Sequence, residues 1–259
     1  MKVLPSVSSV ETSGKYRVRR LLDPLARALV HLLCRVEIKG LHNIPPEGPV
    51  ILLANHINFA DVSILIALMP RRPVGMAKEE VVRNWLLGPF LRLYGTIPIR
   101  RGEVDRQALR RALDVLAEGE HIMMIAPEGH RSGDGRLQKA RDGVAFIAIR
   151  SNAVVVPVAV MGVEHFWRRM VRFRRTMVRI VVGEGFRFKN PGGKPTRDQL
   201  REMTAEAMYR LASLLLPEYR GVYSDLGQAG TRHLDFDVGP QRTAHVVSRE
   251  ASPEEHMTV

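Results

Sequence analysis

The sequence has a single cysteine and no long apolar run. Cys34 stands alone among 259 residues, which excludes an internal disulfide and a cysteine-based metal site and is typical of a reducing compartment. No stretch of 18 apolar residues occurs, so we expect no ordinary transmembrane helix, and the first 20 residues lack the apolar core of a signal peptide. We therefore expect a protein that is soluble or lies on a membrane surface.

Several catalytic signatures are also missing. There is no G-x-S-x-G elbow, no H-E-x-x-H motif and no zinc-ligand spacing, and the segment NPGGKPT lacks the first glycine of a phosphate loop. No nucleic-acid module is recognisable either. We expect no metal and no cofactor.

The charge is strongly and unevenly basic. The net charge is +12, and residues 221–259 hold three Arg against six acidic residues, so the basic excess lies in residues 1–220. A body of this charge favours polyanions such as nucleic acid, anionic lipid or phosphorylated substrates, although a high isoelectric point alone needs no such partner.

Short apolar runs alternate with helical patterns from Val36 onward. The runs are apolar on both faces, as in VILLA and VVVPVAV, which is typical of central strands covered on both sides. The alternation predicts an α/β domain over residues 21–220, with a mixed, largely parallel central sheet covered by helices on both faces. Strands are expected at 35–39, 49–54, 73–77, 95–99, 121–126, 154–160 and 177–183. Helices are expected at 61–69, 80–93, 104–118, 140–150, 162–172 and 196–216.

The two ends of the chain differ from this core. Residues 1–20 are expected to be flexible, and residues 221–259 to form a disordered tail. Between the flexible N-terminal residues and the first strand, an amphipathic helix is expected at about 23–34, with Asp23 as N-cap and Pro24 as its first residue. This helix is too short to cross a bilayer and either packs on the domain or lies in a membrane interface.

The segment NHINFAD places His56 and Asp61 between a strand and a helix. Five residues apart in one helix they would point in nearly opposite directions, so they meet only if His56 precedes the helix and Asp61 lies in its first turn. The pair then suits a general base whose tautomer is held by a carboxylate. The alternative is an ordinary N-cap beside a loop histidine.

Cationic side chains follow several of the expected strands. Lys78, Arg100, Arg101 and Arg131 would converge on one edge if those strands are parallel, which favours a phosphate site over unrelated surface charges. Arg131 follows a turn formed by APEG, which also contains Glu128 and Gly129.

A basic and aromatic segment, HFWRRMVRFRR, suits either stacked bases or a lipid headgroup layer. We expect its Trp167, Arg168, Arg169, Arg172 and Phe173 to contact an anionic membrane surface, unless the segment is an ordinary exposed helix.

Taken in order, these elements resemble the glycerolipid acyltransferase family, whose best-known members acylate lysophosphatidate. The likeness covers about residues 36–185. Its blocks correspond to Asn55, His56 and Asp61; to Gly95 through Gly102; to Pro127, Glu128, Gly129, Arg131 and Ser132; and to Val156, Pro157 and Val158, with Lys78 matching the family lysine. The sequence departs from the family pattern at Arg100, Ala126, His130 and Arg141, which bears on the acceptor headgroup.

The resemblance implies an enzyme of phospholipid biosynthesis. A fatty acyl group would pass from acyl-CoA or acyl-ACP, as co-substrate, to a hydroxyl of lysophosphatidate, with His56 as general base, Asp61 orienting it, and no metal. Lys78, Arg101, Glu128, Gly129 and Arg131 would bind the phosphate and glycerol of the lysophospholipid. The implied location is peripheral, on the cytoplasmic face of a membrane. Glycerol 3-phosphate or another lysolipid as acceptor, a non-catalytic anionic-lipid binder, and a nucleic-acid binder are the alternatives.

Overall fold

The central element of the protein is a seven-stranded sheet with the order β1-β7-β6-β2-β5-β3-β4. The computed structural model describes residues 13–100 and 105–238. Every neighbouring pair of strands is parallel except β6 and β7, which are antiparallel. The strands are β1 (Cys34–Lys39), β2 (Val50–Ala54), β3 (Arg72–Lys78), β4 (Ile97–Ile99), β5 (His121–Ile125), β6 (Val154–Met161) and β7 (Thr176–Val182). The α/β class and the mixed, largely parallel sheet are confirmed.

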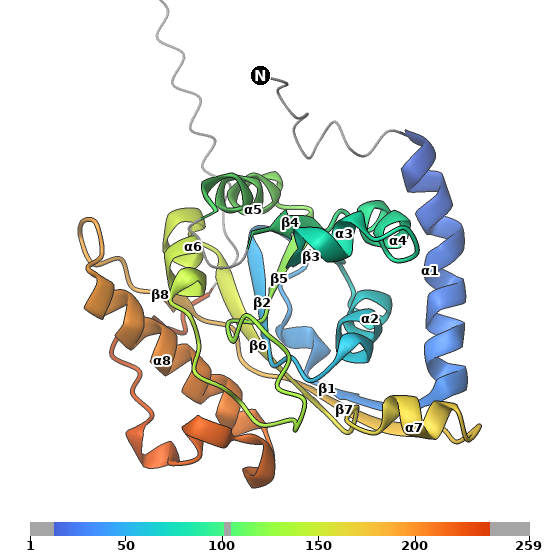
Figure 1. Cartoon of the computed structure of the whole chain (residues 1–259). Coiled ribbons are helices and arrows are strands. Elements are labelled where there is room, and N and C mark those ends of the chain that lie inside the picture. The colour runs from blue at the N-terminus through green and yellow to red at the C-terminus, as the bar shows by residue number, and fades with distance from the viewer. Residues whose placement is uncertain (1–12, 101–104, 239–259) are drawn as a thin grey trace, which may run out of the picture.

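Helices cover both faces of this sheet (Figure 1). One apolar cluster packs α5 (Arg106–Glu118), α6 (Gly143–Ser151) and α8 (Arg197–Leu214) against the sheet. The other cluster packs α1 (Ser13–Leu33) and α2 (Phe59–Leu68) against it. Strands β2, β5 and β6 are buried along their whole length, as expected from runs that are apolar on both faces.

Helix α1 differs from the expectation at its beginning. It starts at Ser13, so residues 13–20 are helical rather than flexible, and Pro24 lies inside the helix instead of at its first position. Asp23 is not an N-cap: its carboxylate accepts a hydrogen bond from the Tyr94 hydroxyl at 3.1 Å. Arg19 lies over the Tyr94 ring on one side of the proline, and Arg27 donates to the Ala67 carbonyl on the other. These tertiary contacts hold the helix across a residue that removes a backbone hydrogen bond. Residues 1–12 lie outside the described part.

The expected helix at 80–93 is divided in two. The structure has α3 (Glu79–Arg83) and α4 (Gly88–Leu93), because the Asn84 side chain accepts from the amides of Leu86 and Leu87 and so closes a turn between them. The expected helix at 162–172 is reduced to α7 (Phe166–Met170).

The expectation of a disordered tail from residue 221 is wrong as far as Val238. Short helical turns at η3 (Pro217–Tyr219), η4 (Gly221–Tyr223) and η5 (Leu226–Gln228) pack on the domain, and Tyr223 and Leu234 are buried. The strand β9 (Leu234–Asp235) pairs with β8 (Arg187–Phe188). Such short turns leave no helical or strand periodicity in the sequence. Residues 239–259 lie outside the described part. A further short turn, η2 (Leu41–Asn43), follows β1.

Candidate active site

The expected functional residues gather at one edge of the sheet. Strands β2, β5, β3 and β4 are neighbours and parallel, so their carboxyl ends lie along the same edge. His56 follows β2, Glu128 follows β5, Lys78 ends β3 and Arg100 follows β4. Ligands in open α/β sheets bind at such an edge.

His56 and Asp61 are in contact, as predicted. The His56 Nδ1 lies 3.0 Å from the Asp61 Oδ1, and the carboxylate is almost fully buried with 1% of its side chain exposed. A carboxylate only accepts hydrogen bonds, so Nδ1 carries the proton and Nε2 is left unprotonated in the neutral ring. The ring is partly exposed, so a substrate proton can reach Nε2.

The Asp61 carboxylate also fixes the turn that precedes α2. Its Oδ2 accepts from the backbone amides of Ile57 at 2.7 Å and Asn58 at 2.8 Å. Asn58 caps the helix through Ala60 N, and Asp61 completes a capping box. The alternative of Asp61 as an ordinary N-cap is wrong, because Asn58 is the N-cap and Asp61 is the N3 residue of the capping box. One carboxylate thus supports the helix start and contacts the imidazole.

Each carboxylate oxygen of Glu128 accepts a hydrogen bond from a backbone amide. The side chain is buried, with its Oε1 accepting from His56 N at 3.1 Å and its Oε2 accepting from Gln138 N at 2.9 Å. Burial raises the pKa of Glu128 above its ordinary value, and the two amide hydrogen bonds oppose that shift. Both oxygens thus hold the loops around His56, a role that differs from the expected contact with substrate.

The turn after β5 reaches back to the histidine loop. Ser132 N donates to the His56 carbonyl at 2.8 Å. Gly129 adopts a left-handed φ of +72°, and a Cβ there would press against the Arg141 side chain. Arg131, two residues on, is exposed near the edge and available to an anion.

The remaining cations of the predicted phosphate site differ in how available they are to an anion. Lys78 is exposed at the end of β3. Arg100 donates to the Glu79 carboxylate at 3.0 Å, so its charge is partly neutralised. Arg101 lies outside the described residues.

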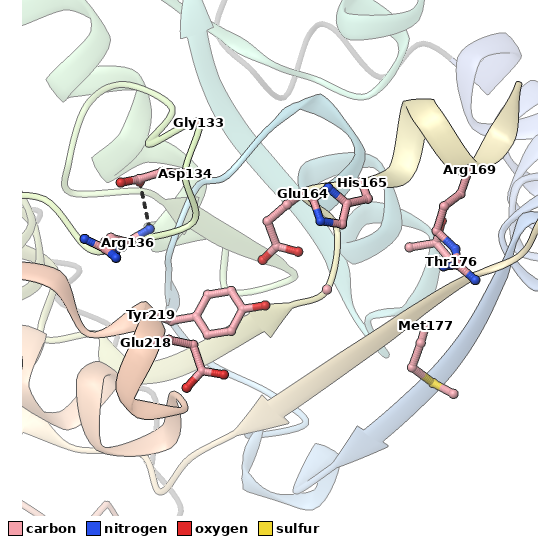
Figure 2. Close-up of a pocket in the computed structure, with 11 residues that line it drawn as sticks. Gly133, Asp134, Arg136, Glu164, His165, Arg169, Thr176, Met177, Glu218 and Tyr219 are labelled. Carbon is pink, nitrogen blue, oxygen red and sulfur yellow. Dashed lines mark hydrogen bonds between the residues drawn. The ribbon is translucent and has the colours of Figure 1, made fainter.

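A cavity of about 650 Å³ lies at the end of β6 and the beginning of β7 (Figure 2). Two of its neighbours contact the histidine loop. Gly133 lies on its wall directly after Ser132, and Gly162 and Glu164 flank Val163, whose carbonyl accepts from Asn58 Nδ2. Burial, together with a hydrogen bond to the neighbouring Glu164, raises the pKa of Tyr219 to about 12. The lining is completed by Asp134, Arg136, His165, Arg169, Thr176, Met177 and Glu218.

The basic and aromatic segment is exposed apart from Phe166, which is buried, and Met170, which is partly buried. Trp167 and Phe173 are open to solvent, the latter 99% exposed, and Arg168 and Arg172 are exposed beside them. Arg169 donates to the carbonyl of Arg175 and lines the cavity.

Arg175, in turn, donates to the carbonyls of His31 and Cys34. It therefore fastens the end of this segment to the C-terminal end of α1.

A further apolar surface was missed in the sequence. Trp85, between α3 and α4, is 84% exposed, and Leu86 and Phe90 are also open to solvent. The feature that could have revealed it is Asn84, a turn-forming residue, followed by Trp-Leu-Leu. A single helix over 80–93 places these apolar residues within a helical pattern instead of in an exposed turn. On the adjoining α1 the exposed leucines follow a helical stripe at Leu25, Leu29 and Leu32.

Neither metal clusters nor membrane-spanning helices are found in the described ranges. Residues 13–100 and 105–238 contain no group of three or more His, Cys, Asp or Glu side chains that could hold a metal ion. None of the helices in that part of the chain is both long and apolar enough to cross a bilayer.

Comparison with known proteins supports the resemblance seen in the motifs. The family model described as Acyltransferase matches residues 35–161. A protein of Limnanthes douglasii named 1-acyl-sn-glycerol-3-phosphate acyltransferase is 33% identical over 157 residues, covering 60% of this chain and 56% of that protein. The human protein named 1-acyl-sn-glycerol-3-phosphate acyltransferase alpha is 26% identical over 145 residues, covering 53% and 50%. The chain thus spans about half the length of these relatives.

The fold also has a solved counterpart. The crystal structure titled 1-acyl-sn-glycerophosphate (LPA) acyltransferase, PlsC, from Thermotoga maritima, superposes with a TM-score of 0.59 at 23% identity. The match covers 78% of this chain and 80% of that one, and at this identity it supports the fold.

Proposed function

We propose that this chain, whose residues 35–161 match the Acyltransferase family model, is a glycerolipid acyltransferase that transfers a fatty acyl group from an acyl thioester to a hydroxyl of lysophosphatidate. The observation that carries the proposal is the His56–Asp61 pair at 3.0 Å, beside a cationic edge of the sheet. Relatives named for this activity support the choice of acceptor.

The reaction needs a base and no covalent enzyme intermediate. His56 Nε2 takes the proton of the acceptor hydroxyl, and the alkoxide attacks the thioester carbonyl. The tetrahedral intermediate collapses by breaking the C–S bond, and the imidazolium returns the proton to the departing thiolate, so that an ester and a thiol are formed. A general base contributes roughly 10²–10⁴-fold. Asp61 keeps Nε2 free and stabilises the imidazolium.

The order of the strands suggests how two substrates meet at His56. The exposed cations Lys78 and Arg131 lie on the β5, β3 and β4 side of β2 and suit the acceptor phosphate. Arg101, outside the described residues, stays a phosphate contact predicted from the sequence. The cavity lies on the other side, over β6 and β7, and has room for the polar arm that carries the thioester. That arm is common to acyl-CoA and acyl-ACP. Glu128 and Gly129 shape the loop that presents Arg131.

We also propose that the enzyme works on an anionic membrane surface, where its lipid acceptor lies. Three exposed apolar segments support this: the leucine stripe of α1, the Trp85 turn and the Trp167–Phe173 segment. Contacts join both other segments to α1, through Tyr94–Asp23 and through Arg175 to His31. Each basic residue near an anionic surface contributes about 1 kcal/mol.

The activity is tested directly with purified protein. Labelled acyl-CoA and acyl-ACP would each be incubated with lysophosphatidate, glycerol 3-phosphate or lysophosphatidylcholine. We expect phosphatidate as the main product, and a loss of at least about 10²-fold in kcat for His56→Ala. The matched control is His42→Ala, since His42 is exposed at the opposite edge of the sheet. A folded His56→Ala protein with normal turnover contradicts the proposal.

The membrane proposal is tested by flotation with liposomes. Three exposed arginines of the basic and aromatic segment are changed to Gln together: Arg168, Arg172 and Arg174. The control carries the same charge change on the far side of the molecule (Figure 1), at and near the start of α8: Lys194, Arg197 and Arg201. We expect only the first variant to lose binding to anionic liposomes. Equal binding of wild type to neutral and anionic liposomes contradicts the proposed surface.

A further inference from the structure

A short C-terminal segment, Pro217–Tyr223, lies against the loop that follows β5. We name it the strap, and we name residues 126–142 the Glu128 loop. The strap lies beyond the residues that the family model matches, and it comprises the turns η3 and η4. Its Glu218 and Tyr219 also line the cavity beside the histidine loop (Figure 2).

Three hydrogen bonds join the strap to the Glu128 loop. Leu137 N donates to the Tyr219 carbonyl at 2.9 Å, and Val222 N donates back to the Leu137 carbonyl at 3.2 Å. Ala140 N donates to the Tyr223 hydroxyl at 3.2 Å. Leu137 and Tyr223 are buried, so the loss of such a bond leaves a polar group without water.

The same stretch of loop is linked to the catalytic histidine. The backbone N–H of Gln138, directly after Leu137, donates to Glu128 Oε2, and Glu128 Oε1 accepts from the backbone N–H of His56. A continuous chain of contacts therefore runs from the strap through the Glu128 carboxylate to the backbone of His56.

Close approach of the strap depends on Gly221. This residue has a left-handed φ of +52°, and a Cβ there would overlap the backbone carbonyl of Leu137. Any side chain at this position strains its own backbone and also pushes the strap away from the loop.

We infer that the strap positions the general base: Gly221 and Tyr223 hold residues 137–140 so that Glu128 fixes the backbone of His56. This inference rests on the proposed acyl transfer. The strap bonds Leu137 and Ala140, next to the Gln138 link to Glu128, and not Arg131. Its loosening is therefore expected to shift Glu128 and His56 and lower kcat, while the KM of the phosphorylated acceptor stays nearly unchanged.

The first test compares two glycine substitutions. Gly221→Ala is expected to lower kcat roughly 10- to 100-fold, because misplacement of a catalytic group by about 1 Å has effects of that size. The control is Gly192→Ala, which has a similar positive φ of +79° but no neighbouring atom within 4 Å of the added Cβ. It carries the same backbone strain without displacing the loop, and we expect a wild-type kcat.

The second test removes one hydroxyl and remains informative if Gly221→Ala fails to fold. Tyr223→Phe is expected to lower kcat about three- to tenfold, the effect of one hydrogen bond. The control is Tyr209→Phe: the Tyr209 ring packs edge-on against Tyr223, but its hydroxyl bonds Gln228 instead of the loop. Amide hydrogen exchange should become faster at Ala140 in Tyr223→Phe and stay unchanged in Tyr209→Phe.

The outcomes separate the two proposals. If the wild type transfers no acyl group, the proposed function is refuted. The amide exchange rate of Ala140 still shows whether the strap is bonded to the Glu128 loop. An active wild type with unchanged kcat in folded Gly221→Ala and Tyr223→Phe overturns the positioning role. A raised acceptor KM with normal kcat also overturns it, since the strap would then act on binding.

Discussion

Replacing Asp61 with Asn should stop catalysis while keeping the fold. In the native protein Oδ2 accepts from Ile57 N and Asn58 N, and Oδ1 faces His56 Nδ1. An Asn side chain has one oxygen. If that oxygen remains with the two backbone donors, the amide NH2 faces Nδ1 and donates to it. The imidazole must then carry its proton on Nε2, where it cannot accept one from the substrate.

The opposite orientation of the Asn amide would restore the productive tautomer at a high cost. It leaves two buried backbone amides without an acceptor, at about 1–3 kcal/mol each. A total of about 2–6 kcal/mol makes the productive form about 30-fold to more than 10⁴-fold rarer. Loss of the general base itself is worth roughly 10²–10⁴-fold. Both routes predict a fall in kcat of at least about 30-fold.

The assay combines turnover and stability. Initial rates with labelled acyl donor give kcat, and thermal unfolding checks that the Asn58 cap still holds the helix. Groups that act as one unit are not additive, so Asp61→Asn in a His56→Ala background should lower the residual rate no further. The reasoning is refuted if Asp61→Asn is folded and turns over like wild type, or if the two changes multiply.

Three further outcomes are expected. Arg131→Ala and Arg101→Ala should each raise the KM of the phosphorylated acceptor roughly 10- to 100-fold, the effect of one charge-assisted hydrogen bond, and leave the donor KM unchanged in steady-state kinetics. Burial raises the pKa of Glu128, so protonation is favoured in the folded state: the stability due to this group is present below its unfolded pKa and is lost as pH rises through its folded pKa. The free energy of unfolding, measured with urea at several pH values, should fall with rising pH in the wild type and fall less in Glu128→Gln. The same pH dependence in both proteins would contradict this expectation. Trp85→Ser should weaken liposome binding that persists in high salt while sparing turnover on detergent-dispersed acceptor, because Trp85 is exposed and distant in sequence from the catalytic loops.

The sequence was sufficient for the sheet and for the contact between His56 and Asp61. Strands such as β2 and β6 are apolar on both faces and end at turn residues, so their place in the centre of the sheet follows from composition alone. The His56–Asp61 contact is local, since the capping turn of α2 brings the two together within six residues. Local chemistry decides both features, and both are confirmed by the structure.

Features that depend on tertiary contacts were not predictable in the same way. Helix α1 continues through Pro24 because Tyr94 and Ala67, far along the chain, bond its side chains. The strap has no periodicity because it is held by single contacts to the Glu128 loop. The two backbone amides that donate to Glu128 are likewise not predictable from a motif, because they come from loops that only the fold brings together.

The burial of Glu128 argues for a functional role of this carboxylate. Its raised pKa means that the folded protein bears a cost for keeping the charge away from water. An apolar side chain would avoid that cost but would leave the amides of His56 and Gln138 without acceptors. Because these two donors face different oxygens of Glu128, a neutral amide would present its oxygen to one of them and a donating NH2 group to the other. A carboxylate alone among side chains of this length accepts from both loops at once. The loops that carry His56 and Gln138 therefore meet on the one group able to bridge them, which suits the proposed proton transfer.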